Sequence, residues 1–429
     1  MRGLGVARLG EAGQSGAVTG PTTTLRGRIW RPSLVDGGGA WLDDGVIEID
    51  AGGVITAIGP APAGSPIAPS HPGCVLLPGL VDAHVHYPQT RVLGSASGPL
   101  LEWLAATVFP EEARFAERAY AEAVAAEFCA ALIAQGTTTA AIFGSPHPAA
   151  TDVLFAALDR AGLRALAGMT LMDRGAPAPN LLAAGPAIAA CEALIERWHG
   201  HEGGRLRFCV TPRFALSCSP GLLRAAGELA ARHGLWVQTH LSENRAEIAA
   251  TAAAFPGSRD YLGVYEDHGL CGERSLFAHC IWLEDDQWDR FAARRATVAH
   301  CPDSNFFLGS GCMRVRAPLA RGIRVGLGSD VGAGRTFSLR QVAARAHDAA
   351  LMVGDAVRPE ELLWLATRGG ARALGVDDRV GALEVGFEAD VIAVALPEHV
   401  PEDRRIDGLL FRLDAGPVAA TYVRGRRLG

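Results

Sequence analysis

The chain has 429 residues, of which 49% are hydrophobic and 20% are charged, and its formal net charge at pH 7 is −6. This composition excludes a disordered chain, and the length allows two domains or one large barrel with an appendage. The negative charge disfavours nucleic acid and anionic membrane surfaces as partners, and we count no continuous apolar run of the roughly 18 residues needed to cross a bilayer.

The chain starts with a glycine-rich segment, residues 1–23, that lacks a continuous apolar run and is expected to be a flexible extension. Residues 24–77 are expected to form the first part of a small β-sandwich, because short apolar runs alternate there with turn residues. Gly52 and Gly53 mark a hairpin turn. The strands are predicted near residues 25–30, 45–50 and 54–59.

The middle of the chain, residues 78–375, alternates short β-branched runs with stretches of helical period. Eight candidate strands in this range favour a closed (β/α)8 TIM barrel of the α/β class over a doubly wound sheet. The strands are predicted near residues 79–86, 137–143, 163–171, 206–214, 235–240, 275–280, 296–301 and 323–330. Helices are predicted near residues 115–134, 181–199, 219–233 and 338–352.

The last part of the chain, residues 376–429, returns to short strands, which are predicted at 391–394 and 418–423. Strands from both ends flank the predicted barrel. The sequence therefore predicts one small β-sandwich that is assembled from the two ends of the chain.

A pair of histidines closes the first predicted barrel strand, in the run Pro78-Gly-Leu-Val-Asp-Ala-His-Val-His86. Alternate strand residues point to the same face, so His84 and His86 lie on one side of the strand. The motif is weak alone and could mark an ordinary polar strand end. At the carboxyl end of a barrel strand it places two imidazoles where active sites form.

Further candidate ligands end later strands: His240, His279 and Asp330. Three imidazoles and one carboxylate form a ligand set that zinc takes when one position stays open for water. Zinc lowers the pKa of that water to about 7, and a carboxylate such as Asp330 can accept its proton. Glu243 follows His240 by three residues, and this carboxyl group could carry protons between the water and a departing amine.

The sequence resembles the amidohydrolase superfamily and, within it, is similar to the guanine deaminases, from about residue 76 to residue 345. The run from Pro78 to His86 and the terminal Asp330 mark the superfamily, while Gln89 with Arg213 and Phe214 narrows the resemblance. The other supporting segments are Leu100-Leu-Glu-Trp-Leu104 with Phe109-Pro110, Gly136-Thr-Thr-Thr139, Thr211-Pro-Arg-Phe214, His240-Leu-Ser-Glu-Asn244, His300-Cys-Pro-Asp-Ser-Asn305 and Gly328-Ser-Asp330.

The resemblance implies a homodimeric enzyme that deaminates a purine, with one zinc ion in each chain. A water activated by the zinc would attack C2 of guanine and give xanthine and ammonia. The zinc ligands would be His84, His86, His240 and Asp330. Asp330, Glu243 and His279 would be catalytic, with Glu243 as the proton shuttle and His279 as a hydrogen-bonding group. Gln89, Arg213 and Phe214 would contact the purine.

The amino-acid inventory limits the alternatives. The Lys+Arg count of 40 is made up of arginine alone, which excludes a carbamylated lysine between two metals and argues against a binuclear hydantoinase type. The nine cysteines form no Cys-x-x-Cys pair and suit reduced thiols in the cytoplasm. The alternatives that stay open are deamination of another aminated heterocycle, such as 8-oxoguanine or a triazine, and a non-catalytic scaffold on the same barrel.

Overall fold

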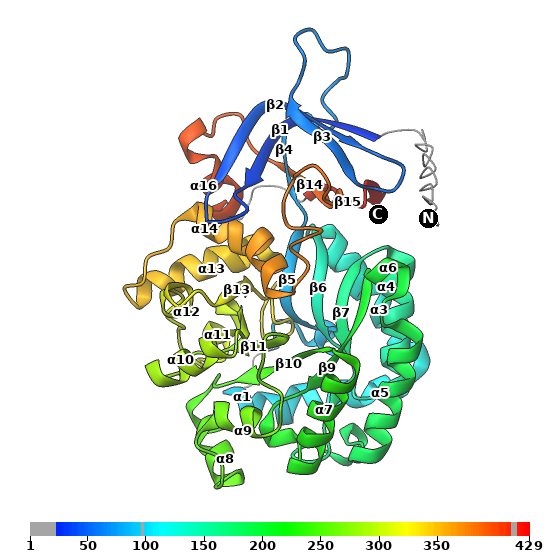
Figure 1. Ribbon diagram of the computed structural model, residues 1–429, viewed down its shortest axis with the longest axis vertical. Helices are drawn as coiled ribbons and strands as arrows, with labels where there is room; N and C mark the ends of the chain where they lie inside the picture. Colours follow the sequence, from blue (N-terminus) through cyan, green and yellow to red (C-terminus); the bar gives the residue numbers. More distant parts are fainter. Residues whose placement is uncertain (1–22, 96–97, 413–417) are drawn as a thin grey trace, which may run out of the picture.

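The computed structural model describes residues 23–95, 98–412 and 418–429 of the protein. Its chain forms a barrel ringed by helices, with a separate β-sheet at one end (Figure 1). The helices α1, α8 and α9, which follow carboxyl ends of barrel strands, lie at the end away from this sheet. The predicted flexible extension lies outside the described residues, except for Thr23, which begins β1.

The barrel consists of parallel strands in sequence order. Within the described residues, eight of them lie side by side in the order β13-β12-β11-β10-β9-β7-β6-β5, and the short β8 (Thr170–Leu171) pairs with β9. Each corresponds to one predicted strand, so the predicted barrel is confirmed. Their bounds are β5 (Leu80–His86), β6 (Thr137–Phe143), β7 (Arg164–Gly168), β9 (Leu206–Pro212), β10 (Trp236–Leu241), β11 (Ser275–His279), β12 (Thr297–His300) and β13 (Arg324–Leu327).

The first and last barrel strands meet through the segment that follows β13. The Asp330 N–H donates to the His84 carbonyl at 2.8 Å, and the His86 N–H donates to the Val331 carbonyl at 3.0 Å. These bonds favour a closed barrel over an open doubly wound sheet. They also bring Asp330 next to the two histidines of β5.

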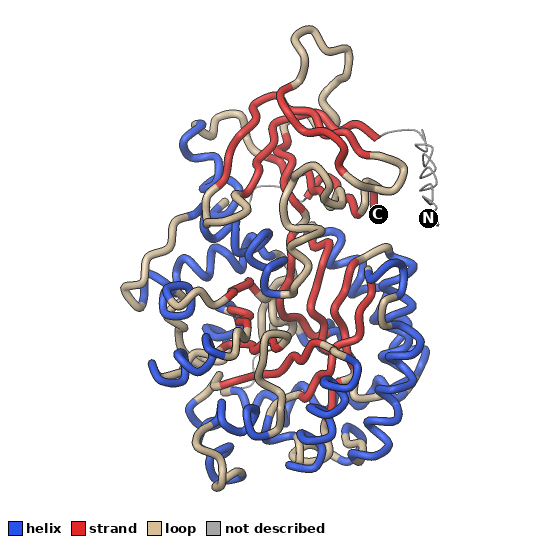
Figure 2. Tube along the Cα trace, viewed as in Figure 1, coloured by secondary structure: helices blue, strands red, loops and turns tan. Residues whose placement is uncertain are grey.

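Helices surround the strands of the barrel (Figure 2). Local signals set their ends: in α7, the Ser219 hydroxyl accepts from the Leu222 N–H at 3.1 Å, and Gly234 ends the helix with a φ of +62°. The α-helices are α1 (Leu100–Trp103), α2 (Phe109–Ala113), α3 (Arg118–Ala134), α4 (Pro148–Ala161), α5 (Ala184–Trp198), α6 (His201–Gly204), α7 (Pro220–His233), α8 (Arg245–Ala254), α9 (Tyr261–Asp267), α10 (Asp285–Ala293), α11 (Pro302–Phe307), α12 (Arg316–Ala320), α13 (Leu339–Met352), α14 (Pro359–Trp364), α15 (Gly370–Ala373) and α16 (Arg405–Phe411).

One helical stretch among the described residues, Ala178–Trp198, is long and apolar enough to cross a membrane by length and composition. It does not appear in the sequence as a continuous apolar run, because three charged residues interrupt it: Glu192, Glu196 and Arg197. In the structure, α5 forms most of this stretch and packs on the barrel beside α4, α7 and β9. Its buried side chains belong to the main hydrophobic core.

The strands from the two chain ends form a separate sheet, as predicted. Within the described ranges it is one sheet of seven strands in the order β16-β15-β14-β4-β1-β2-β3, rather than two sheets held together by packing alone. The reason is β4, a strand that was not predicted, which pairs with both β1 and β14. The strands are β1 (Thr23–Pro32), β2 (Gly39–Ile49), β3 (Ile55–Pro60), β4 (Cys74–Pro78), β14 (Val391–Ala395), β15 (Val418–Val423) and β16 (Arg426–Leu428).

The predicted hairpin turn between β2 and β3 depends on glycine. Gly53 has a φ of +82°, and a Cβ at this position would lie 2.3 Å from the carbonyl oxygen of Arg424. Asp50 stabilises the same turn by accepting from the N–H groups of Gly52 at 2.8 Å and Val54 at 3.0 Å. The domain boundaries at 77/78 and 375/376 stay predictions.

A partly buried group of charges joins this sheet to the barrel, and we call Arg164, Arg379 and Glu388 the base cluster. Arg164, at the start of β7, donates to Glu388, and the Nε of Arg379 donates to the same carboxylate at 2.8 Å. Arg164 is 2% exposed and Glu388 is 7% exposed. Each buried charge of this cluster therefore faces the opposite charge.

Candidate active site

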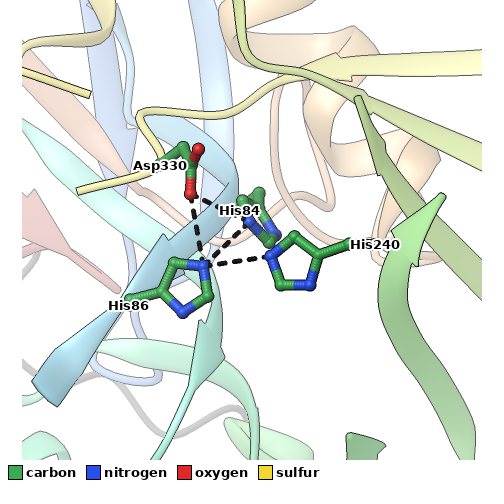
Figure 3. Close-up of side chains that lie close together, drawn as sticks. All are labelled: His84, His86, His240 and Asp330. Atoms are coloured by element: carbon green, nitrogen blue, oxygen red, sulfur yellow. Dashed lines mark hydrogen bonds and ion pairs between the residues drawn. The ribbon is translucent and has the colours of Figure 1, made fainter. Parts of the chain in front are cut away.

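Three imidazoles and one carboxylate meet inside the carboxyl end of the barrel, in the part of the chain that the structure describes (Figure 3). His84 and His86 come from β5, His240 comes from β10, and Asp330 follows β13. Their ligand atoms all lie within 4.8 Å of one another. The structure thus brings together the four side chains that the resemblance assigned to a metal.

The atoms at the centre of this group lie close to one another. Oδ1 of Asp330 is 3.1 Å from Nε2 of His84 and 3.2 Å from Nε2 of His86. Nε2 of His86 is 3.1 Å from Nε2 of His84 and 3.3 Å from Nε2 of His240. The ring of Phe143 packs against all three imidazoles and forms an apolar wall behind them.

His86 and His240 are neutral at ordinary pH. Burial lowers the pKa of His86 to about 3, and burial with the nearby imidazoles puts the pKa of His240 well below its usual range. Nδ1 of His240 lies 2.5 Å from the carbonyl oxygen of Arg213, which can only accept, so Nδ1 carries the hydrogen. Nε2 of His240 therefore carries a lone pair, and this lone pair faces the other atoms that could bind a metal.

The carboxylate of the group is ionised. Burial alone would raise the pKa of Asp330, but hydrogen bonds from His84 and His86 hold this pKa well below its usual range. Neutral imidazole nitrogens that face one another around a carboxylate oxygen suit a divalent metal ion. The residues present therefore fit the metal that the sequence analysis expects.

The backbone is strained where strands deliver these side chains. Asp330 has a φ of +48°, His279 has a φ of +71° and Ser242, just after His240, has a φ of +49°. Such left-handed conformations cost about 1–3 kcal/mol each in residues other than glycine and persist where the surrounding structure holds them. Asp82 helps to hold this segment, because its carboxylate accepts from the Ser329 N–H at 2.9 Å and the Ser329 hydroxyl at 2.5 Å.

Glu243 and His279 lie beside the four candidate metal-binding side chains, which we call the ligand group. Oε2 of Glu243 is 3.5 Å from Nε2 of His279, which in turn is 3.8 Å from Oδ2 of Asp330. Glu243 is 3% exposed, and burial together with the charge of Asp330 raises its pKa to about 8. This carboxyl group therefore holds a proton near neutral pH and is placed to give it up.

A pocket of about 380 Å³, its open mouth included, adjoins the ligand group. The pocket is lined by Gln89 from the 3₁₀-helix η1 (Tyr87–Val92), by Arg213 and Phe214 after β9, and by Glu243 and His279. Its apolar walls include Leu100, Trp103, Leu104 and Leu308.

A family model described as the amidohydrolase family matches residues 75–428. The chain belongs to this family. The amidohydrolase is 38% identical over 366 residues to guanine deaminase from Escherichia coli, covering 82% of this chain and 83% of that protein. It is 43% identical over 357 residues to the probable guanine deaminase from Deinococcus radiodurans, covering 80% and 81%.

Solved structures agree with these sequence relatives. The Escherichia coli guanine deaminase matches this amidohydrolase with a TM-score of 0.89 at 33% identity, covering 96% of this chain and 99% of that chain. A guanine deaminase from C. acetobutylicum with bound guanine in the active site gives a TM-score of 0.89 at 30% identity, covering 95% and 100%.

Sequence reasoning missed several residues that support the site of this amidohydrolase. Glu247 accepts from the N–H groups of Glu243 at 2.9 Å and Asn244 at 3.1 Å, and the Asn-x-x-Glu spacing of a capping box could have indicated it. Oδ1 of Asn305 lies 2.9 Å from Nδ1 of His279 and orients this ring. Glu112, which lies behind Arg213, carried no local signal at all.

Proposed function

We propose that the protein is a guanine deaminase that converts guanine and water to xanthine and ammonia. The observation that carries this proposal is that side chains of the ligand group line the same pocket as Arg213 and Gln89. The guanidinium and amide groups can bind the polar edge of a purine while C2 faces the ligand group. The match to guanine deaminases over four fifths of the chain supports the same reaction.

We propose zinc as the metal and His84, His86, His240 and Asp330 as its ligands. A zinc ion held there would supply an activated water at neutral pH by lowering the pKa of that water to about 7. One ion per chain is expected, because the chain has no lysine that could be carbamylated to bridge a second ion.

The protein's own side chains then move the protons. Asp330, an ionised carboxylate beside the attacking water, accepts a proton from it. Glu243 gives its proton to the ring nitrogen beside C2, takes the second proton from the attacking oxygen and passes it to the departing amine. The proton held by Asp330 then returns to Glu243, which restores both side chains. The bond from water oxygen to C2 forms, the bond from C2 to the amino nitrogen breaks, and ammonia leaves. His279, 3.5 Å from Glu243, orients the reacting oxygen by hydrogen bonding.

The cellular setting is part of the proposal. All nine cysteines are unpaired thiols, which supports a reducing compartment such as the cytoplasm. The homodimer implied by the family resemblance is a prediction that light scattering of the purified protein tests.

A substrate panel tests the proposed reaction. Metal-loaded protein is mixed separately with guanine, 8-oxoguanine, adenine and an aminated triazine, and xanthine or the matching product is quantified with ammonia. The Glu243→Gln variant gives the background rate. We expect the highest kcat/KM for guanine. Faster turnover of another heterocycle would replace guanine as the substrate, and no turnover of any would favour a non-catalytic scaffold.

A further inference from the structure

We propose that Glu112 is a positioning residue that sets substrate specificity. It fixes Arg213 and Gln89 so that this side of the pocket presents hydrogen-bond donors and no acceptor. The inference rests on the proposed function, because it assigns the purine edge that these donors select.

Glu112 is a buried carboxylate behind the pocket wall. It lies on α2, after α1 and the π-helix η2 (Leu104–Val108), and is 0% exposed. Nη1 of Arg213 donates to both of its oxygens, at 2.8 Å and 2.7 Å. Arg213 itself is 3% exposed, so the ion pair lies in a region of low dielectric where charge-assisted bonds are strong.

The same carboxylate determines how the Gln89 side chain is turned. Nε2 of Gln89 lies 3.3 Å from Oε1 of Glu112, and Oε1 of Gln89 lies 3.2 Å from the backbone nitrogen of Gly332. The Gly332 N–H can only donate and the Glu112 carboxylate can only accept. The amide oxygen is therefore held at Gly332, and Nε2 keeps a second hydrogen beyond its bond to Glu112.

The orientation of the Arg213 guanidinium is also fixed by its neighbours. Its Nη1 is engaged by Glu112, and its Cζ lies 5.3 Å from the centre of the Phe109 ring. Arginine has five N–H donors and no acceptor, so the groups left for a ligand are donors only. The backbone carbonyl of Arg213 also accepts from His240, which couples the orientation of this wall to the ligand group.

A pocket wall that presents only hydrogen-bond donors selects the substrate by the chemical group attached to C6 of the purine. Guanine shows a carbonyl oxygen there, which accepts, whereas 2,6-diaminopurine keeps the reacting 2-amino group and shows an amino donor at C6. Opposed donors leave buried polar groups unpaired, which is costly. A glutamine at position 112 can donate as well as accept, so it removes the fixed acceptor beside Gln89. The Gln89 amide can then turn its oxygen toward the ligand at the expense of its bond from the Gly332 N–H.

Adjacent glutamates give a matched test. Glu111 is also buried, but it bonds Tyr120 and, at 3.0 Å, Arg114, and it does not line the pocket. We compare Glu112→Gln with Glu111→Gln in kcat and KM for guanine and 2,6-diaminopurine, with metal content measured on each sample. Glu112→Gln should lower kcat/KM for guanine by about 10- to 100-fold, mainly through KM, as expected for one or two charge-assisted bonds.

The decisive quantity is the ratio of kcat/KM for guanine to that for 2,6-diaminopurine. It should fall by about tenfold or more in Glu112→Gln and stay at the wild-type value in Glu111→Gln. An unchanged ratio with equal losses for both substrates would overturn the inference and leave Glu112 a structural role. If Glu112→Gln does not fold, Glu112→Asp decides, because it keeps the charge but retracts it from Gln89. An intermediate ratio supports the inference, and a wild-type ratio overturns it.

Failure of the proposed function is a separate outcome. If metal-loaded wild-type protein turns over neither substrate, the guanine deaminase proposal falls and this inference falls with it. If the wild type is active and the ratio in Glu112→Gln is unchanged, only the inference about Glu112 falls.

Discussion

The two ends of the barrel both bury ionisable side chains, but they arrange them in opposite ways. In the base cluster, Glu388 accepts from Arg164 and Arg379, so each charge meets its opposite. At the carboxyl end, Nε2 of His86 lies 3.1 Å and 3.3 Å from the Nε2 atoms of His84 and His240, so that like groups face one another. Burial is common to both ends. In a site for a cation, by contrast, metal-binding nitrogen and oxygen atoms converge on one point, and no positively charged side chain lies opposite them.

Removing one side chain of the ligand group should have the largest effect on metal binding and activity. We expect His86→Ala to lose its metal and all deaminase activity, because the remaining three ligands no longer close around the ion. Metal analysis and a guanine assay on the same sample check this. Full metal content in the variant would show that the convergence of donors is not what holds the ion.

Glu243→Gln should abolish most of the turnover while the metal stays bound. Glu243 is not one of the four converging ligands, and a glutamine cannot carry the proton. The expected loss in kcat is about 10²- to 10⁴-fold, the usual contribution of general acid–base catalysis. Steady-state kinetics at wild-type metal content checks it, and a kcat near that of the wild type would remove Glu243 as the shuttle.

Close packing behind the ligands gives a smaller effect. A Cβ at Gly328 would lie 2.7 Å from Cβ of His84 and 2.9 Å from Sγ of Cys301, whereas a Cβ at Gly185 in α5 meets nothing within 4 Å. Gly328→Ala should lose about 1–3 kcal/mol of stability and bind the metal more weakly, because His84 must shift. Gly185→Ala is the control and should retain wild-type stability and metal affinity, as measured by thermal unfolding and metal titration. Equal behaviour of the two variants would contradict the close packing.

The base cluster should affect stability and leave the kinetics unchanged. Glu388→Gln leaves the buried Arg164 and the partly exposed Arg379 without their carboxylate, and breaking a buried pair such as Arg164–Glu388 costs about 3–5 kcal/mol. Glu384→Gln, which removes a half-exposed pair with Arg31, is the control and should cost about 0–1 kcal/mol. Calorimetry and guanine kinetics of both variants check this. A selective fall in kcat in Glu388→Gln would show that the two ends are coupled.

Much of the fold follows from local pattern. The barrel strands are short, mainly apolar runs between helices. Closure of the barrel then places His84, His240 and Asp330 together although 246 positions separate the first from the last. Strand β4 was not predicted, because only Gly79 divides it from β5 and the two apolar runs belong to different sheets. The division depends on partners that lie far away in the sequence.

The supporting residues of the site were harder to predict. Glu111 and Glu112 are neighbours of the same type, and both are buried. Only the path of α1, η2 and α2 over the pocket decides that Glu112 meets Arg213, 101 positions later in the chain, while Glu111 meets Arg114 and Tyr120. No local spacing distinguishes the two.

The central claim is that the four converging side chains hold one metal ion on which guanine deamination depends. The most direct test removes the metal by chelation and titrates zinc back while the rate of xanthine formation is followed. We predict no activity in the metal-free protein and a linear rise that ends at one zinc per chain. Activity that survives complete removal of the metal, or that rises until two ions are bound, would contradict this account.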